Sequence, residues 1–440
     1  MRHSESRIFS DIIYAKTTAF LALCRALKDT HFTRKRKMPL DTLILTVLFR
    51  KGRTLHMELR GFKKIFALKE AISKVGYLKQ RLKLNPAAFL ELARYHARNF
   101  YRGIEIVKKK NGYLILAVDG SAINIPTTEE NVSVYGNSSR NNVKQQALLG
   151  ASCLYDTINK MIIDCRINRC KFSEREQALL HIDNMMDVIG DHSSVIIFDR
   201  GYPAGEFFID LMERQQRFLV RLSPTTFKKE QKQMTEDDCM IEVIFDKARI
   251  NPHKGTHTEE KLTKTGSISL RFVRVMLRNG EYEYLATNLI PEEFSTKEMG
   301  ELYSMRWEIE TVFDDLKNKL SIENFTGTKP ILLEQDIFAT IYLCNIMNDI
   351  MLEAQIELDQ TDGHCGKHVM TINKNIAIGI MKEDLIYFIL EKNDRKRKDR
   401  MDSIVNEIKR NLLPIRKGRH YPRTKGNLTG KYSNTRKRSY

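Results

Sequence analysis

The chain has 440 residues, of which 73 are lysine or arginine and 55 are aspartate or glutamate, so its formal net charge is +18 at pH 7. A charge excess of this size indicates a polyanionic partner, and a composition of 42% hydrophobic and 29% charged residues excludes a fibrous or largely disordered protein. The length allows two or three domains, and the lack of a long apolar run or of an apolar stretch behind a basic start predicts a cytoplasmic protein with no membrane span and no secretory signal.

Residues 1–105 have the apolar spacing of helices, interrupted by polar breaks. Basic clusters accompany these helices, at residues 34–37 and at Lys79, Arg81 and Lys83. The combination predicts a helical region that binds nucleic acid. The expected helices cover about 40–49, 62–75 and 84–101.

From about residue 112 the pattern changes to that of strands. Turn-forming residues at 156–159 separate two of these strands and predict a hairpin. Ser173 and Glu176 have the spacing of a capping box, so a helix is expected from Ser173 to about Val188. Three strands, a helix and a further strand are the order of an α/β layer with a mixed sheet. The expected strands are 113–118, 147–154, 161–167 and 195–198.

More extended segments follow and predict a β insertion within the α/β domain, at about residues 217–292. Helical spacing then returns in two long helices, roughly 296–320 and 333–357. The predicted regions are N-terminal helices at 1–105, an α/β domain at 106–330, C-terminal helices at 331–394 and a basic tail at 395–440.

The tail carries most of the positive charge. Residues 395–440 contain 16 lysines and arginines against three acids, which is 13 of the 18 net charges. Few large apolar residues occur there, so the tail is expected to be disordered until it meets an acidic partner. A solvated tail that serves only solubility is the alternative.

Two of the expected strands end in an aspartate that a glycine follows closely. The run GYLILAV leads into D-G-S at 119–121, and SSVIIF leads into D-R-G-Y at 199–202. A carboxylate at the tip of a buried strand lies at the edge of the sheet, where a ligand can approach. Asp119 and Asp199 are therefore candidate site residues, although either aspartate alone is equally well explained as a turn residue.

The expected helix at 296–320 gathers four functional side chains on one face. At 100° per residue, Tyr303, Arg306, Glu310 and Lys317 fall within about 60° of one another. An apolar stripe runs beside them and would bury the helix against a core. A solvated, salt-bridged face is the other explanation of the same pattern.

The spacing Y-x2-R-x3-E-x6-K, together with D-G-S and D-R-G-Y, resembles the DDE transposases of bacterial insertion sequences. It is similar in particular to the subgroup with the Y-R-E-K signature and a β insertion before the catalytic glutamate. The resemblance extends from about residue 38 to the C-terminus. It implies a ribonuclease H-like catalytic domain at 106–330, and it assigns the binding of DNA ends to residues 1–105.

The resemblance also implies the chemistry of the site. Asp119, Asp199 and Glu310 would be the catalytic residues and the ligands of two Mg²⁺ ions, which Mn²⁺ can replace. Carboxylate oxygens suit Mg²⁺, and two such ions promote in-line displacement at phosphorus.

Residues around Glu310 would then contact DNA. By the resemblance, Arg306, Lys317 and Tyr303 would hold phosphates of the transposon end. Trp307, the single tryptophan, lies at the edge of the same predicted face; stacking on a base and packing in the core are both open for it.

The predicted function is that of a DNA transposase, which binds the inverted repeats of its own element, cleaves at the ends and joins the 3′-OH ends to target DNA. The expected partners are double-stranded DNA and a second copy of the chain in the synaptic complex, at the nucleoid of a bacterium. The alternatives are a nuclease of the same fold without strand transfer and an inactive, transposase-derived DNA-binding protein. No phosphate-binding glycine motif is present, so no nucleotide cofactor is expected.

Overall fold

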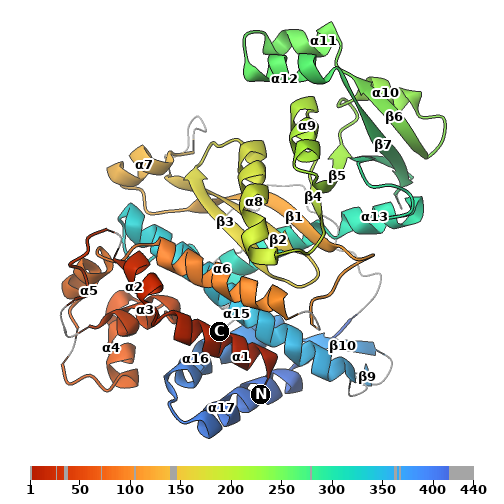
Figure 1. The fold of residues 1–440 in the computed structure, drawn as a ribbon. Coiled ribbons are helices and arrows are strands. Elements are labelled where there is room, and N and C mark those ends of the chain that lie inside the picture. The colour runs from red at the N-terminus through yellow and green to blue at the C-terminus, as the bar shows by residue number, and fades with distance from the viewer. Residues whose placement is uncertain are drawn as a thin grey trace. The chain divides into compact units, whose positions relative to one another are not determined.

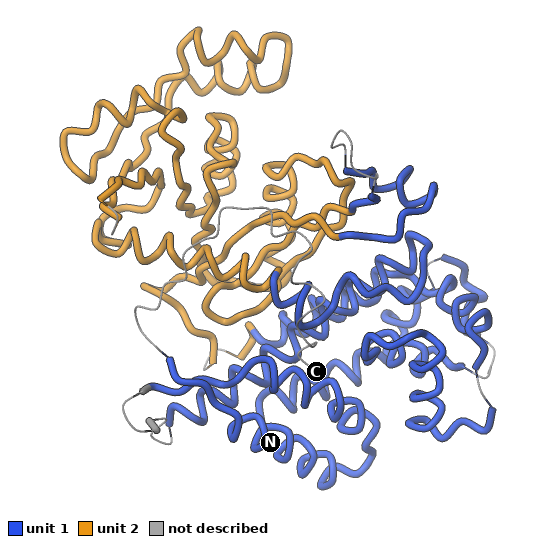
Figure 2. The backbone as a smooth tube through the Cα atoms, turned by 180° about the vertical axis from the view of Figure 1, so that it is seen from behind, with its two compact units in different colours: residues 1–100, 124–148, 314–440 blue, residues 101–123, 149–313 orange. Residues whose placement is uncertain are grey.

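The computed structural model describes residues 2–25, 27–33, 38–70, 72–103, 106–138, 146–277, 280–360, 364–365 and 368–415. This described part of the chain forms two compact units (Figure 2). Unit 1 consists of Met1–Phe100, Asn124–Leu148 and Asp314–Tyr440, and unit 2 of Tyr101–Ile123 and Leu149–Phe313.

Unit 2 is built on a mixed sheet, which has eight strands within the described residues (Figure 1). The strand order is β3-β2-β1-β4-β5-β8-β7-β6. The central strands β1, β4 and β5 pair in parallel, and β2 and β3 form the antiparallel hairpin that the turn residues predict. The strands are β1 Leu114–Asn124, β2 Leu148–Asp156, β3 Ile162–Arg169, β4 Ser194–Phe198, β5 Arg217–Leu222, β6 Asp238–Ile244, β7 Ser267–Met276 and β8 Tyr282–Thr287.

Two helices connect the parallel strands. Helix α8 (Glu174–Ile189) leads from β3 to β4 and packs against β3, and α9 (Gly205–Glu213) leads from β4 to β5. The Ser173 side chain accepts a hydrogen bond from the Glu176 amide, so α8 begins where the capping pattern places it. The order β3-β2-β1-β4-β5 with these connections is that of a ribonuclease H-like domain, and the predicted fold class is confirmed.

The segments predicted as a β insertion extend this same sheet. Strand β8 pairs antiparallel with β5, and β7 and β6 follow outward. The connections contain α10 (Lys228–Gln233), α11 (Lys247–Ile250) and α12 (His257–Thr265), and α12 packs against α9. Helix α13 (Thr296–Ser304) covers one face of the sheet, because its Met299 and Leu302 are buried in one cluster with Val195 and Leu219.

Unit 1 is mainly helical. Its longest described helix, α15 (Pro330–Gln360), packs against α1, α3, α16 and α17. By length and composition α15 could span a membrane, but 89% of its apolar window is buried within the protein, which is the pattern of a core helix. The other elements are α1 His3–Tyr14, α2 Thr18–Cys24, α3 Leu40–Leu48, α4 Leu55–Ile65, α5 Lys74–Arg81, α6 Ala87–Arg102, α7 Glu129–Tyr135, β9 His364–Cys365, β10 His368–Ile372, α16 Lys374–Leu390, α17 Asp394–Arg410 and β11 Leu412–Pro414.

The predicted helix at 62–75 is wrong. Helix α4 ends at Ile65, and Ala67 has a positive φ of 48°, a conformation that a helix cannot contain. A new helix, α5, begins at Lys74, where the Ser73 side chain accepts a hydrogen bond from the Gly76 amide. The apolar residues of this stretch therefore belong to two helices.

The predicted disorder of the tail is wrong for its first part. Residues 394–410 form α17, whose Met401, Ile404, Val405 and Ile408 are buried. These four residues recur at the spacing of one helix face, which gives the segment an apolar side despite its high charge. The residues from 416 onward, like the basic cluster at 34–37, lie outside the described residues.

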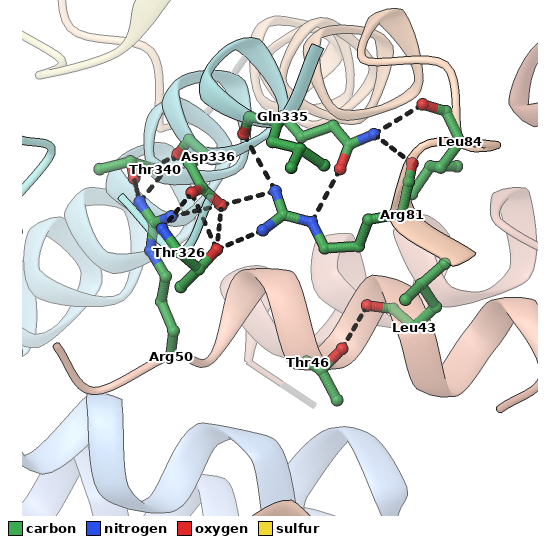
Figure 3. Close-up of polar contacts among 10 residues, drawn as sticks. Leu43, Thr46, Arg50, Arg81, Leu84, Thr326, Gln335, Asp336 and Thr340 are labelled. Carbon is green, nitrogen blue, oxygen red and sulfur yellow. Dashed lines mark hydrogen bonds and ion pairs between the residues drawn. The ribbon is translucent and has the colours of Figure 1, made fainter. Parts of the chain in front are cut away.

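A buried ionic cluster joins the N-terminal helices of unit 1 to α15 (Figure 3). Asp336 on α15 is fully buried and forms ion pairs with Arg50 and Arg81. Its Oδ2 also accepts a hydrogen bond from the Thr326 amide at 2.9 Å, and Gln335 accepts one from Nε of Arg81 at 2.9 Å. Arg81 is thus a buried structural residue, not part of a basic surface as the sequence predicts.

Candidate active site

The strand register of unit 2 places Asp119 and Asp199 side by side. In the parallel pair of β1 and β4, Ala117 is the partner of Ile197, and each aspartate lies two residues further along its strand. Asp199 follows the last residue of β4, as predicted. Strand β1 does not end at Asp119 but continues to Asn124; what ends there is its fully buried part.

The predicted helix at 296–320 is not continuous. Helix α13 ends at Ser304 and α14 (Trp307–Asp314) begins three residues later. At the break the amides of Met305 and Arg306 bond to carbonyls three residues back, which overwinds the chain. A π-helical turn, Asp315–Lys319, follows α14. A rotation of 100° per residue therefore does not hold across the signature, and the predicted continuous helix is wrong.

The break nevertheless brings three signature residues to the aspartates. The Tyr303 hydroxyl donates to Oδ1 of Asp199 at 3.3 Å. Arg306 donates from Nη2 to Oε1 of Glu310 at 2.6 Å, and its Nη1 lies 3.8 Å from Oδ2 of Asp119. Tyr303 and Arg306 are buried, at 6% and 7% exposure, so their positions are fixed by packing.

The other two predicted residues are Trp307 and Lys317. Trp307 is the first residue of α14 and is 49% exposed, so packing in the core does not explain it. Lys317 belongs to the π-helical turn and to unit 1, and its contact with DNA stays a prediction.

The electrostatics of the site favour a bound cation. The pKa of Asp119 is raised to about 6, chiefly by burial and also by the carboxylates of Glu174 and Glu310, while the Gly120 amide and Arg306 lower it. A carboxylate in this environment is stabilised by any additional positive charge. Burial lowers the pKa of Arg306, but its hydrogen bond to Glu310 and its charge interactions with Tyr303, Asp199 and Glu310 together outweigh burial and leave the pKa raised, so the guanidinium stays charged.

The donor set fits Mg²⁺ in its chemistry. Asp119, Asp199 and Glu310 supply hard oxygen atoms, which this ion prefers. Among the described residues, no three acidic, histidine or cysteine side chains lie close enough together to hold a metal ion. In this structure the Arg306 guanidinium pairs with Glu310 and faces Asp119. Glu310 must exchange this partner before it can hold a cation.

Sequence reasoning missed further polar residues at this site. Glu174 lies on the first turn of α8, and its negative charge raises the pKa of Asp119. The charge of Asp199 in turn raises the pKa of Glu174. On β8, Glu283 is 9% exposed and pairs with Arg221 of β5 at 3.0 Å. Burial raises the pKa of Glu283, although the positive charges of Arg221 and Arg306 lower it in part. The capping pattern at Ser173 predicts where α8 begins, but nothing in the sequence indicates which strand ends that turn faces.

Comparisons with known proteins agree with the geometry. The family described as "Transposase DDE domain" matches residues 110–346 of this chain. The transposase InsG for insertion sequence element IS4, from Escherichia coli (strain K12), is 22% identical over 248 residues. The match covers 55% of this chain and 53% of InsG, so it spans about half the length of that relative.

Among solved structures, the piggyBac transposase in its synaptic complex with hairpin DNA is similar over 90% of this chain and 84% of that one, with 11% identity and a TM-score of 0.42. The family match is the stronger finding, because residues 110–346 are more than half of the chain and contain the strand-end aspartates and the whole Y-R-E-K signature. This chain belongs to the family of transposases with a DDE domain.

Proposed function

We propose that this protein binds the terminal inverted repeats of its insertion sequence, cleaves the DNA at these ends by metal-dependent hydrolysis and transfers the 3′-OH ends to target DNA. The observation that supports it is the convergence of Asp119, Asp199, Tyr303, Arg306 and Glu310 in one site of a family member. Residues 1–105 would bind the ends and residues 106–330 would carry out catalysis.

The acidic residues would hold the metal and the basic ones the DNA. Asp119, Asp199 and Glu310 would bind two Mg²⁺ or Mn²⁺ ions, which supply activation of the attacking oxygen and stabilisation of the leaving oxygen. Arg306, released from Glu310, would bind a phosphate oxygen, as an arginine fork does well. Because two ends are joined in one reaction, at least two copies of the chain would act together on DNA, in the bacterial cytoplasm at the nucleoid.

The test uses the purified protein and the DNA that flanks its gene. Mg²⁺ or Mn²⁺ should support nicking at the ends, and Ca²⁺ should support assembly without cleavage. Ends that are cut beforehand should be joined to a target plasmid. Cleavage without joining would identify a nuclease of the same fold, and binding without cleavage an inactive DNA-binding protein.

Arg306 is expected to matter more for the end complex than for general DNA binding. Replacing Arg306 or Lys317 by Ala should weaken the complex with end DNA by about tenfold, roughly one charge-assisted hydrogen bond, and binding to random duplex much less. Gel-shift titrations on both DNAs measure this, with Lys254→Ala as the control for loss of one exposed charge. An equal loss on both DNAs would show a general electrostatic role.

The end of the tail is expected to bind phosphates without reading sequence. Residues 416–440 contain nine lysines and arginines and no acid. A chain that ends at Ile415 keeps α17 and β11, and it should show a flatter dependence of log K on log salt, by about 0.9 for each phosphate that these residues neutralise. The preference for the correct end should persist, since phosphate contacts carry little sequence information. Parallel salt slopes for the two chains would support the solubility role instead.

A further inference from the structure

Glu174 shares the space between the two strand-end aspartates, although the reaction above makes no use of it. Gly120 follows Asp119, and Gly201 lies two residues after Asp199. A Cβ atom on Gly120 would lie 3.4 Å from Oε1 of Glu174, and a Cβ atom on Gly201 would lie 3.8 Å from Oε2. The nearest atom to a Cβ on Gly120 would be Cζ of Phe172, at 3.0 Å. The Glu174 carboxylate therefore lies beside both glycines, at ordinary contact distance, one oxygen toward each.

The first turn of α8 is tied to the loop that carries Asp199. Arg175 donates from Nε to the carbonyl of Tyr202 at 3.0 Å and from Nη2 to the carbonyl of Gly201 at 3.3 Å. The Ser173 cap fixes the same turn from its other side. Glu174 is thus held toward the aspartates by the backbone of its own helix, while its carboxylate stays exposed and open to an incoming ion.

The Tyr202 hydroxyl is a second and independent sign of a ligand. Tyr202 is 1% exposed, and its hydroxyl has no hydrogen-bond partner among the described residues. The ring packs against Phe198 and Phe207, which fixes where the hydroxyl lies. Burial raises its pKa well above the usual value, and the carboxylates of Glu174, Asp119 and Asp199 raise it further. A buried, protonated hydroxyl without an acceptor is costly, so an acceptor that binds here would satisfy it.

We propose that Glu174 is a fourth acidic residue of the metal centre. Among the described residues its carboxylate and those of Asp119 and Asp199 are not yet close enough together to hold an ion, so a divalent cation would draw the three together, and the Tyr202 hydroxyl would donate to an oxygen of water or phosphate beside that cation. This inference rests on the function proposed above. Four carboxylates carry a charge of −4, which balances two divalent cations. Arg306 then supplies the net positive charge that attracts the phosphate.

Metal binding without DNA tests the role of Glu174 apart from catalysis. Mn²⁺ is titrated into the full-length protein, and free Mn²⁺ is followed by its paramagnetic resonance signal. Glu174→Gln should weaken Mn²⁺ binding by about tenfold or more, as loss of a ligand or its support does. Glu176→Gln, an exposed glutamate on the same turn, is the matched control and should bind like the wild type. Equal affinities of the two variants would overturn the proposal.

Thermal unfolding without metal separates a ligand from a structural residue. Glu174→Gln removes a like charge beside Asp199, so its melting temperature should equal or exceed that of the wild type. Tyr202→Phe removes a hydroxyl without a partner and should also keep the melting temperature, yet weaken inorganic phosphate binding in the presence of Mn²⁺. A lower melting temperature of Glu174→Gln with unchanged Mn²⁺ affinity would show a structural role and overturn the proposal.

Asp199→Asn distinguishes this proposal from the function on which it rests. If Asp199→Asn weakens Mn²⁺ binding and Glu174→Gln does not, the proposed metal centre is supported and the role of Glu174 is overturned. If neither variant differs from the wild type, both the metal centre and the role of Glu174 fall. Weaker binding by both variants, with the Glu176→Gln control unchanged, supports both.

Discussion

Replacing Asp119 or Asp199 by Asn, or Glu310 by Gln, should reduce DNA cleavage and strand transfer by about 10³-fold or more, which corresponds to about 4 kcal/mol of the barrier. The reason is that each change removes a carboxylate from a site that needs negative charge to hold its cations. The measurement is single-turnover cleavage of end DNA in Mg²⁺, followed by joining of ends that were cut beforehand.

Folding and DNA binding should survive these changes. Asp119 is a carboxylate that burial penalises, so a neutral asparagine of the same shape should not lower the melting temperature. Gel-shift affinity for the end DNA should stay within about threefold, or about 0.7 kcal/mol, of the wild type. Asp191→Asn, an exposed aspartate after α8, is the control for the chemical change itself. Cleavage retained by any one of the three variants would remove that residue from the proposed metal centre.

The strand-end pair could be predicted from the sequence because its geometry is local. A buried apolar run followed by an aspartate fixes where that aspartate lies on its strand, and parallel pairing of two such strands aligns their ends. Asp119 and Asp199 meet for this reason. The sequence pattern could not show that β1 continues beyond Asp119 to Asn124, because the exposed end of a strand has no apolar alternation to indicate it.

The signature residues come together by a different geometry from the predicted one. The spacing of Tyr303, Arg306 and Glu310 fits one face of an ideal helix, whereas the structure breaks the helix at Met305. No proline or glycine occurs there to announce the break. We attribute the break to tertiary contacts, because Arg306 turns inward to pair with Glu310 and to face Asp119. Asp119 is far from Arg306 in the sequence, so no local pattern indicates this contact.

Long-range pairing also explains the residues that were misread or missed. Arg81 belongs to a basic cluster by sequence, yet its charge is buried against Asp336, which is 255 residues away. Glu174 is one of two acids near the start of α8, and only the packing of that turn beside Gly120 and Gly201 distinguishes it. A charge pattern alone predicts how much charge a segment has, but not which charges find partners.

Replacing Asp336 by Ala should cost about 3–5 kcal/mol of unfolding free energy, because it leaves the buried Arg50 and Arg81 without their shared carboxylate. Urea unfolding of the full-length protein, followed by circular dichroism, measures the loss. The protein has two compact units, and Asp336 belongs to unit 1. The unfolding transition that moves to lower urea concentration should therefore be that of unit 1. Asp336→Asn keeps an acceptor for the Thr326 amide, so it should lose less unfolding free energy than Asp336→Ala.

The pH dependence of unfolding tests whether the negative charge of Asp336 is what stabilises the protein. Burial raises the pKa of Asp336, but Arg50, Arg81 and the hydrogen bonds from Thr326 together outweigh burial and hold it below its ordinary value of 3.8. A carboxyl with a lowered pKa contributes its full stability above 3.8 and loses it as the pH falls through the folded value. The difference between wild type and Asp336→Asn should therefore be the same at pH 7 and pH 5 and should shrink only in more acidic solution. A difference that is already lost at pH 5 would mean that another group carries the effect.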